Sequence, residues 1–304
     1  MALGVGFFAG LKSSQPAMQS TVDEYMRDNR MFDFQLMSSL GLTESDRAAF
    51  AQLDGVKYAE GAYGVDAMAA VGKTEEPYRF MSVTENVSVP LLVAGRMPET
   101  DGECLADAGA FSKKDIGKTV QLSEDNDADT LDMFTSRSYK IVGIAKSPRY
   151  ISNDRGSTSL GSGSLKGFII LPAAAFNSEV YHEILLYCNF DGALFSSEYD
   201  TARDKLKPRI QQLLNRCGAR RYETLRAETD AKLADAQLEI NDGWDEYYAN
   251  ESSALSQIND GLAQIEAAES EIEQNRAALD DAEKQLEDGL ESIPAARQEI
   301  EQNR

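Results

Sequence analysis

The stretch INDGLAQIEAAESEIEQNRAALDDAEKQLEDGLESIPAARQEI, residues 258–300, decides the fold of the C-terminal part of this chain. One apolar position recurs every seven residues, and the spacing holds without a miss over the whole stretch. Such a heptad pattern is typical of a long α-helix whose apolar stripe packs against another helix in a coiled coil. The pattern predicts an interaction seam of these side chains: Ile258, Ile265, Ile272, Leu279, Leu286, Ile293 and Ile300.

Two further regularities describe this predicted helix. The segment DGLAQI at 260–265 returns as DGLESI at 288–293, and EIEQNR at 271–276 returns unchanged at 299–304, so the repeat is 28 residues long. Self-similarity of this kind indicates a rod built by duplication, in which large and small residues alternate and the helices pack closely. The positions three residues after the seam are small or polar: Gly261, Ala268, Asn275, Ala282, Gly289 and Ala296.

A partner helix is required, because a single amphipathic helix cannot bury its own apolar stripe. The partner comes either from a second copy of the chain or from a helix that returns beyond Arg304. The repeat stops at Arg304 without a capping residue, which favours the returning helix and predicts a truncated coiled-coil segment over residues 223–304. Pro294 is expected to kink or break the helix, since an interior proline costs about 3 kcal/mol.

The charge of the chain is strongly negative and unevenly distributed. The 304 residues carry a formal net charge of −21, and residues 227–304 alone hold 21 acidic and 5 basic side chains. Nucleic-acid binding is excluded as a partner class, because contacts to phosphates need clustered lysine and arginine. Most of the acidity therefore belongs to the predicted helix.

The chain opens with MALGVGFFAG, residues 1–10, which is apolar, rich in glycine and uncharged until Lys12. Ten residues are too few to cross a bilayer, which needs about 20. A buried first helix or a cloning remnant would explain the stretch, but its glycines suit packed membrane helices better. We expect residues 1–10 to be the end of a truncated transmembrane helix, and no other stretch is long and apolar enough to span a membrane.

The region between these two ends shows alternating patterns that predict a mixed α+β domain over residues 11–222. Thr43 is expected to cap a short helix that ends near Gly55, and residues 197–217 are expected to form an amphipathic helix. Three cysteines without a paired spacing fit no complete disulfide framework, although one disulfide stays open. Strands are predicted at residues 32–39, 56–71, 79–83, 119–122, 139–145, 167–171 and 184–188.

No motif reaches the level of a catalytic, cofactor or metal site. Gly72-Lys73-Thr74 and Gly117-Lys118-Thr119 lack the glycine that a phosphate-binding loop needs five residues earlier, so we expect turns there. Residues 125–136 begin like a calcium loop but lack its glycine and its final glutamate. His182 is the only histidine, and no nucleophile-elbow motif accompanies it. No catalytic, cofactor-binding or metal-binding residue is predicted.

Several segments resemble one family of membrane proteins. LGVGFFAGLKSSQPAMQSTVDEYM (residues 3–26) resembles the exit of the first transmembrane helix of FtsX-like, MacB-type ABC transporter permeases. FDFQLMSSLGLTESD, VAGRMPETDGECLAD, IGKTVQL and YKIVGIAKSPRYIS resemble parts of the extracytoplasmic domain that follows this helix in the family. Some Gram-positive members resemble this chain further in carrying an acidic coiled coil.

The resemblance implies a MacB-like extracytoplasmic domain of mixed strands and helices, followed by a long α-helical coiled-coil stalk. It implies a non-enzymatic part of a permease at the cell membrane, lying on the extracytoplasmic side. ATP would be hydrolysed by a separate ABC-type ATPase subunit, reached through membrane parts that this chain lacks. The domain would couple that hydrolysis to export or to mechanotransmission, and would engage an extracellular protein or peptide.

Two other functions stay open at this point. A free-standing structural protein could dimerise through its coiled coil, and it would then form a stable dimer on its own. An extracellular hydrolase would have to use His182, and it would lose its activity when that residue is changed.

Overall fold

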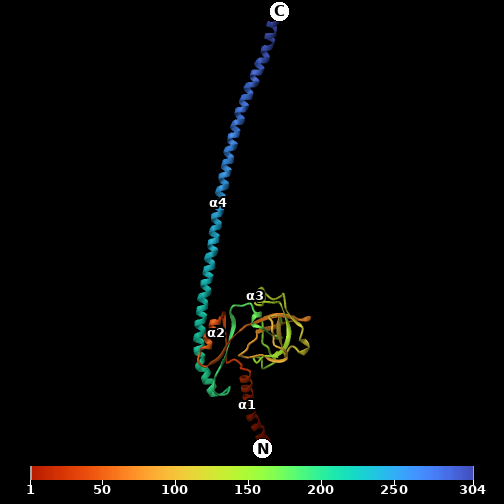
Figure 1. Ribbon diagram of the computed structural model, residues 1–304, viewed down its shortest axis with the longest axis vertical. Coiled ribbons are helices and arrows are strands. Elements are labelled where there is room, and N and C mark those ends of the chain that lie inside the picture. The colour runs from red at the N-terminus through yellow and green to blue at the C-terminus, as the bar shows by residue number, and fades with distance from the viewer. Residues whose placement is uncertain (1, 304) are drawn as a thin grey trace. The chain divides into compact units, whose positions relative to one another are not determined.

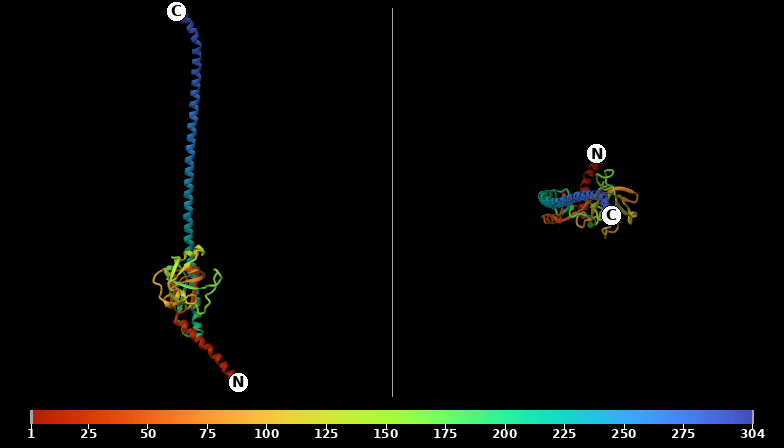
Figure 2. Two further views of the ribbon diagram at one scale, coloured as in Figure 1. Left: turned by 90° about the vertical axis from the view of Figure 1, so that its right-hand side faces the viewer. Right: turned by 90° about the horizontal axis from the view of Figure 1, so that it is seen from above.

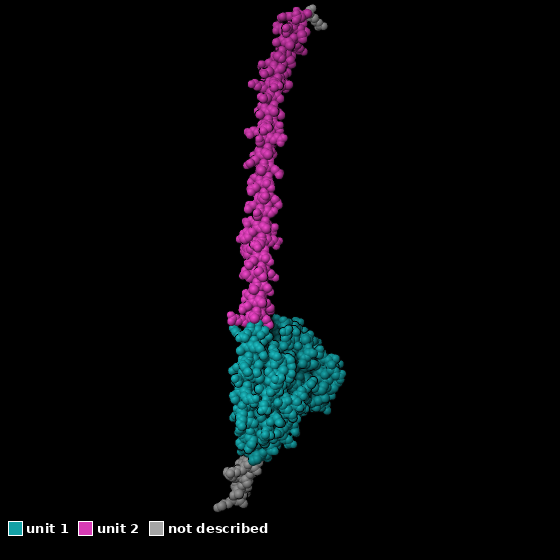
Figure 3. Space-filling view, turned by 60° about the vertical axis from the view of Figure 1, so that its left-hand side comes forward, with its two compact units in different colours: residues 1–225 teal, residues 226–304 magenta. Residues whose placement is uncertain are grey.

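The computed structural model describes the backbone of residues 2–303 and the side chains of residues 14–303 (Figure 1). The chain divides into two compact units, residues 1–225 and residues 226–304 (Figure 3). The first unit holds every strand among the described residues, and the second is helical from residue 226 to residue 302. The helices are α1 (Ala2–Asp28), α2 (Glu44–Ala51), α3 (Ala128–Asp132) and α4 (Ser197–Gln302), with short 3₁₀ turns at Lys113–Asp115 and Ala173–Ala175.

The expected membrane-helix end at residues 1–10 falls on side chains outside those that the structure describes. Their backbone, from Ala2 on, belongs to α1. Among the described residues, no helix combines the length and the apolar character needed to cross a membrane.

A small antiparallel sheet and two helices form one core of the first unit. The sheet has the order β1-β10-β2, with β1 at Phe34–Leu42, β10 at Tyr181–Cys188 and β2 at Val56–Ala62. Helix α2 and the first turns of α4 pack together against this sheet, as Figure 1 shows. The buried side chains of this core are Leu36, Leu42, Phe50, Ala59, Ile184, Leu186, Cys188, Leu206, Ile210 and Cys217.

Helix α2 begins where the sequence predicts it. The side chain of Thr43 accepts a hydrogen bond from the amide of Asp46, and Asp46 accepts one from the amide of Thr43, which completes a capping box. Two amides that the helix itself leaves unbonded are satisfied in this way.

The second core of this unit is a barrel-like sheet with a mixture of parallel and antiparallel pairs. Its order is β5-β8-β6-β9-β4-β3-β7, and β7 also pairs with β8, which closes six of the seven strands into a ring (Figure 2). Closure removes the free edges of those six strands. The strands are β3 (Gly64–Val71), β4 (Thr74–Ser82), β5 (Leu91–Gly95), β6 (Glu103–Asp107), β7 (Thr119–Leu122), β8 (Ser138–Lys146) and β9 (Gly167–Leu171).

Strand β8 is long enough to pair with two strands along the same edge. Residues 138–140 pair with β7, while residues 143–146 pair with β5. Strand β6 occupies the opposite edge of β8 over both parts. Strand β5 therefore lies outside the ring, attached only to the second half of β8.

The interior of the ring is filled by side chains that alternate along the strands. Phe80, Tyr139, Ile141 and Ile169 are fully buried there, and Phe134 lies edge-on against Phe80 with their ring centroids 5.1 Å apart. This apolar interior is a packed core.

The expected α+β domain followed by a long helix is confirmed. The predicted strands 119–122 and 167–171 match β7 and β9 residue for residue. Gly72 and Lys73 form the two-residue turn between β3 and β4, with Gly72 at φ +73°, as such a hairpin requires.

Other expectations need correction. The sequence analysis missed β5 and β6, each only five residues long, and the first half of β4, where Glu75, Glu76 and Pro77 argue against a strand. Pairing with β3 from Val71 to Gly64 overrides that local preference. The single strand predicted at residues 56–71 is two strands, β2 and β3.

Helix α4 continues through Pro294, so the break that was expected there does not occur. A proline removes one backbone hydrogen bond, and the residues that follow it here, Ala295, Ala296 and Arg297, are strong helix formers.

Candidate coupling junction, interaction seam and pocket

The last turns of α1 carry an acid and a base that hold the loop leading into α4. Asp23 and Arg27 are four residues apart, lie on one face of the helix and form an ion pair, with Arg27 Nε 3.0 Å from Asp23 Oδ1. The amide of Leu194 donates to Asp23 Oδ1 at 2.5 Å, and the Arg27 guanidinium donates to the carbonyl of Gly192. Residues 192–194 are therefore bound directly to α1.

The electrostatics of this clamp favour its ionised form. Burial tends to raise the pKa of Asp23, but the hydrogen bonds from the Leu194 amide and from Arg27 outweigh it, so that the pKa is lowered. The hydrogen bond to Asp23 raises the pKa of Arg27. Both groups stay charged at neutral pH.

Asp33, between α1 and β1, joins the end of β10 to the first turn of α4. The hydroxyl of Tyr199 donates to Asp33 Oδ1 at 2.6 Å, and the amide of Cys188 donates to Asp33 Oδ2 at 2.6 Å. Burial raises the pKa of Asp33, and these two hydrogen bonds act against that rise. Burial, and then the bond to Asp33, raises the pKa of Tyr199 well above its usual range.

Aromatic rings complete this junction. Phe190 lies edge-on to both Tyr199, at 5.3 Å between ring centroids, and Phe34, at 6.3 Å. Such pairs add about 0.5–1.5 kcal/mol beyond their buried area. We call the coupling junction the set Asp23, Arg27, Asp33, Phe190 and Tyr199.

A second contact, between Arg220 and Asp46, holds α4 further along within the same unit. Arg220 Nη2 donates to Asp46 Oδ1 at 2.5 Å, and the Asp46 side chain is buried, with 3% of its surface exposed. Asp46 is also the residue that completes the capping box of α2. Helix α4 is thus held at Tyr199 and again at Arg220, some 21 residues later.

The structure places the predicted interaction seam on α4 in the second unit, where each of its side chains is exposed. The exposed fraction runs from 50% for Ile293 to 68% for Ile300. Residues seven apart drift by about 20° per heptad around a straight helix, so a partner helix would have to wind around α4 with a left-handed twist. The seam comprises Ile258, Ile265, Ile272, Leu279, Leu286, Ile293 and Ile300.

The exposed apolar stripe begins earlier on α4 than the sequence analysis predicted. The positions seven and fourteen residues before Ile258 are Glu251 and Trp244. The ring centroid of Trp244 lies 5.9 Å from that of Tyr247. Leu233 and Ile240 precede them at the same spacing as Tyr247, and all are more than half exposed. The heptad count would have found these residues, but the charged Glu251 interrupts it.

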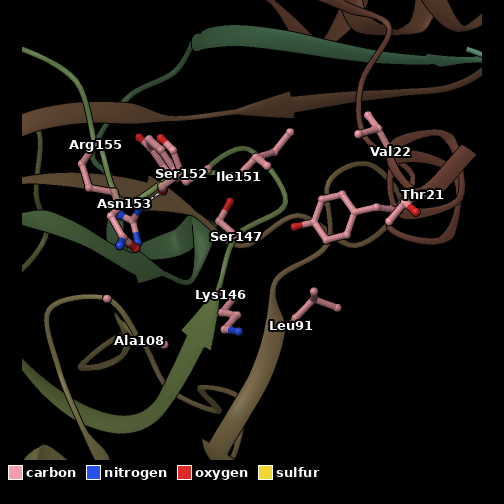
Figure 4. A pocket seen from close by; sticks show the side chains of 13 residues that line it. Thr21, Val22, Leu91, Ala108, Lys146, Ser147, Ile151, Ser152, Asn153 and Arg155 are labelled. Atoms are coloured by element: carbon pink, nitrogen blue, oxygen red, sulfur yellow. Dashed lines mark hydrogen bonds between the residues drawn. The ribbon is translucent and has the colours of Figure 1, made fainter. Parts of the chain in front are cut away.

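A pocket of about 560 Å³ lies in the first unit, between α1, the start of β5 and the segment after β8 (Figure 4). Val22, Tyr25, Leu91 and Ile151 give it apolar walls, and Lys146 adds a cation. Arg155 lines it too, but its Nε pairs with Asp107 Oδ2 at 2.5 Å, and the Asp107 side chain is buried. Sequence reasoning missed this pocket, because its walls come from segments 130 residues apart.

The remaining sequence candidates have structural roles. His182 Nδ1 lies 3.0 Å from the carbonyl oxygen of Gly64, and its ring meets Tyr63 edge-on. All three cysteines are buried and free. In the acidic turn, Asp127 caps α3 by accepting from the amide of Thr130 at 2.6 Å. Among residues 14–303, no cluster of three potential metal ligands occurs.

Comparison with known proteins gives likenesses of fold. The chain is similar to the extracellular domain of the noncanonic ABC-type transporter YknZ from Gram-positive bacteria, at 16% identity and a TM-score of 0.36, covering 59% of this chain and 84% of that one. It is also similar to the periplasmic region of MacB from Actinobacillus actinomycetemcomitans, at 14% identity and a TM-score of 0.36, covering 59% and 76%. No protein-family model and no curated protein matches the chain. The expected resemblance to extracytoplasmic permease domains is thus found as a structural match over 59% of the chain.

Proposed function

We propose that this chain is the extracytoplasmic part of an ABC transporter permease and transmits movement from the membrane to a partner outside it. Residues 1–10 would be the end of a membrane helix, and α1 would continue that helix into the domain. A separate ATPase subunit would hydrolyse ATP, and the chain itself would catalyse no reaction. The segments that resemble FtsX-like permeases support this proposal.

The coupling junction is the observation that carries the proposal. Asp23 and Arg27 bind the loop before α4, and Asp33 binds the first turn of α4 through Tyr199. A displacement of α1 therefore acts on the base of α4 through charge-assisted hydrogen bonds, which are about twice as strong as neutral ones.

The interaction seam would pass this movement on to the partner outside the membrane. Its exposed isoleucines and leucines need a helix partner, which we propose belongs to the same assembly or to an extracellular protein. The acidity of residues 226–304 keeps the other faces of the helix solvated and discourages unspecific contacts.

The proposal is tested in the cells that produce the protein. An affinity tag is inserted into the exposed loop at residues 157–164, membranes are solubilised in mild detergent, and the captured proteins are identified by mass spectrometry. We expect an ABC-type ATPase subunit in amounts close to those of the tagged chain. Recovery of the chain from the soluble fraction, as a dimer without an ATPase, would instead support a free-standing coiled-coil protein.

The coupling itself is tested in the captured complex. Spin labels at Ser20 on α1 and at Gln211 on α4, both at exposed positions, report the distance between the two helices. We expect this distance to change between ATP-bound and nucleotide-free states, and the change to shrink in the variant Asp23→Ala. An Asp23→Ala complex that responds to ATP as the unaltered one does would contradict the coupling role.

A further inference from the structure

Strand β5 is the one strand of the larger sheet, among the described residues, whose second edge has no neighbour. It pairs with β8 from Leu91 opposite Lys146 to Gly95 opposite Gly143. The other six strands form the closed ring. The outer edge of β5 therefore presents backbone N–H and C=O groups that a further strand could bond.

The side chains of β5 are unusual for a free edge. Leu91, Leu92 and Val93 are exposed by 39%, 43% and 47%, and residues 91–95 carry no charge and no proline. Exposed edges are normally protected by lysine, proline or a covering element, because they otherwise attract other chains. Strand β5 is only five residues long and its pairing with β8 shifts register between Leu92 and Ala94, but its three neighbouring aliphatic residues have no charge, proline or covering strand beside them, which indicates a surface that is covered when the protein functions.

The pocket described above opens beside the first residue of this edge. Leu91 belongs both to β5 and to the wall of the pocket, which it shares with Val22 and Ile151 (Figure 4). Lys146, across the ladder from Leu91, forms no ion pair within the described part of the chain. The free edge of β5, the apolar pocket and the side chain of Lys146 thus lie next to one another.

We propose that β5 binds an extended polypeptide segment of a partner protein, which adds to the sheet as an extra strand. Its main chain bonds the outer edge of β5, one of its apolar side chains enters the pocket, and a carboxylate lies near Lys146. Strand addition of this kind derives affinity from main-chain bonds and specificity from alternate side chains. This inference goes beyond the coupling role and does not depend on it.

Charge complementarity favours a different protein over a second copy of this chain. Pairing of two β5 strands would bring residues 91–95 of each copy together, and neither strand carries an acidic group for Lys146. A partner segment with an acidic residue next to aliphatic ones can form an ion pair with Lys146 and place an apolar side chain in the pocket.

The probe is a fluorescein-labelled peptide, Glu-Val-Thr-Val-Thr-Val with an acetylated N-terminus, and the readout is fluorescence anisotropy with the full chain. Two further probes carry N-methyl groups on alternate amides, which removes the main-chain donors of one edge of the peptide at a time. We expect one N-methylated probe to bind at least tenfold more weakly and the other to bind like the parent. Nuclear magnetic resonance shifts on binding should map to Leu91–Gly95.

Variants of the protein make the test specific. Leu92→Lys and Val93→Lys each place a charge on the edge and should weaken binding at least tenfold. Met37→Lys is the matched control, because Met37 is 66% exposed on β1 and lies in the other sheet. Unchanged thermal midpoints show that the variants fold.

Binding to Leu92→Lys and to Val93→Lys that is as strong as binding to the unaltered chain, or no binding by any of the three probes, would overturn the proposal. Self-association of the chain that Leu92→Lys abolishes would also overturn it, since the edge would then belong to a second copy. None of these outcomes touches the coupling role, which is measured at α1 and α4.

Discussion

The hydroxyl of Tyr199 and Oδ1 of Asp33 lie 2.6 Å apart and join the first turn of α4 to the segment that leaves α1. The two residues are 166 positions apart in the chain, yet they share one part-buried hydrogen bond. Asp33 accepts a second bond from the amide of Cys188, at the end of β10. One carboxylate thus connects a helix, a strand and the linker between α1 and β1.

Removing the hydroxyl of Tyr199 should weaken the first unit. In Tyr199→Phe, the part-buried carboxylate of Asp33 loses one of its two donors, which we expect to lower the free energy of unfolding by about 1–3 kcal/mol. Urea unfolding followed by circular dichroism measures this. Tyr222→Phe, on an exposed part of the same helix, is the control and should change nothing. A similar loss in both variants would mean that the hydrogen bond is not responsible.

Gly95, the last residue of β5, should tolerate no side chain. Its φ is +82°, and a Cβ atom there would lie 2.2 Å from the carbonyl oxygen of Val142. We expect Gly95→Ala to cost about 1–2 kcal/mol for the left-handed backbone alone, and more because the neighbouring backbone has to shift. Gly102→Ala is the matched control, since a Cβ atom at Gly102 meets open space. Thermal unfolding of the two variants should differ clearly, and equal midpoints would contradict the assigned geometry.

The ion pair between Arg96 and Glu103 predicts a pH dependence. The hydrogen bonds from Arg96 and from the amide of Glu99 lower the pKa of Glu103 to about 2, against an ordinary value of 4.5. Since the folded-state pKa is depressed, the stabilisation is complete above pH 4.5 and is lost as the pH falls toward 2.

The variant Arg96→Gln tests this pH dependence. Its Glu103 should titrate closer to 4.5, and its stability deficit against the unaltered protein should vanish as the pH approaches 2. Carboxyl chemical shifts and acid unfolding curves measure both effects. A deficit that stays constant with pH would count against the ion pair as its cause.

The interaction seam predicts a position-specific loss of helix pairing. A photo-crosslinking amino acid at Ala268 should capture the partner helix in intact cells. Leu279→Asp introduces a charge into the seam and should reduce the crosslink at least tenfold, because the pairing would then bury an unpaired carboxylate. Ala277→Asp makes the same change on the opposite face of the helix and should leave the crosslink intact. If both variants crosslink alike, the seam is not the contact surface.

Local patterns in the sequence were sufficient to predict the elements that are determined by residues close together in the chain. The four-residue strand β7 follows the turn pair Gly117-Lys118 and alternates polar and buried residues, so it could be read directly. The capping box at Thr43 and Asp46 is a signal within four residues, and the helical character of residues 258–300 follows from seven-residue spacing.

The coupling junction could be predicted only in part. Asp23 and Arg27 have the spacing of an ion pair on a helix, which indicates the acid and base of the clamp. Their binding to Gly192 and Leu194 depends on the fold of the whole unit, and no sequence pattern connects residues so far apart. The same holds for the pocket beside β5, whose walls meet only after β8 has paired with β5.

The division of one edge of β8 between β5 and β7 gives the sheet two levels of stability. Strand β5 can detach from residues 143–146 while the ring of six strands stays closed, because β7 remains bonded to residues 138–140. Its amides should therefore exchange with solvent through a local opening of low free energy, whereas those of β6 and β9 wait for global unfolding. The larger sheet thus combines a closed ring of six strands that unfolds only globally with one outer strand that can dissociate on its own.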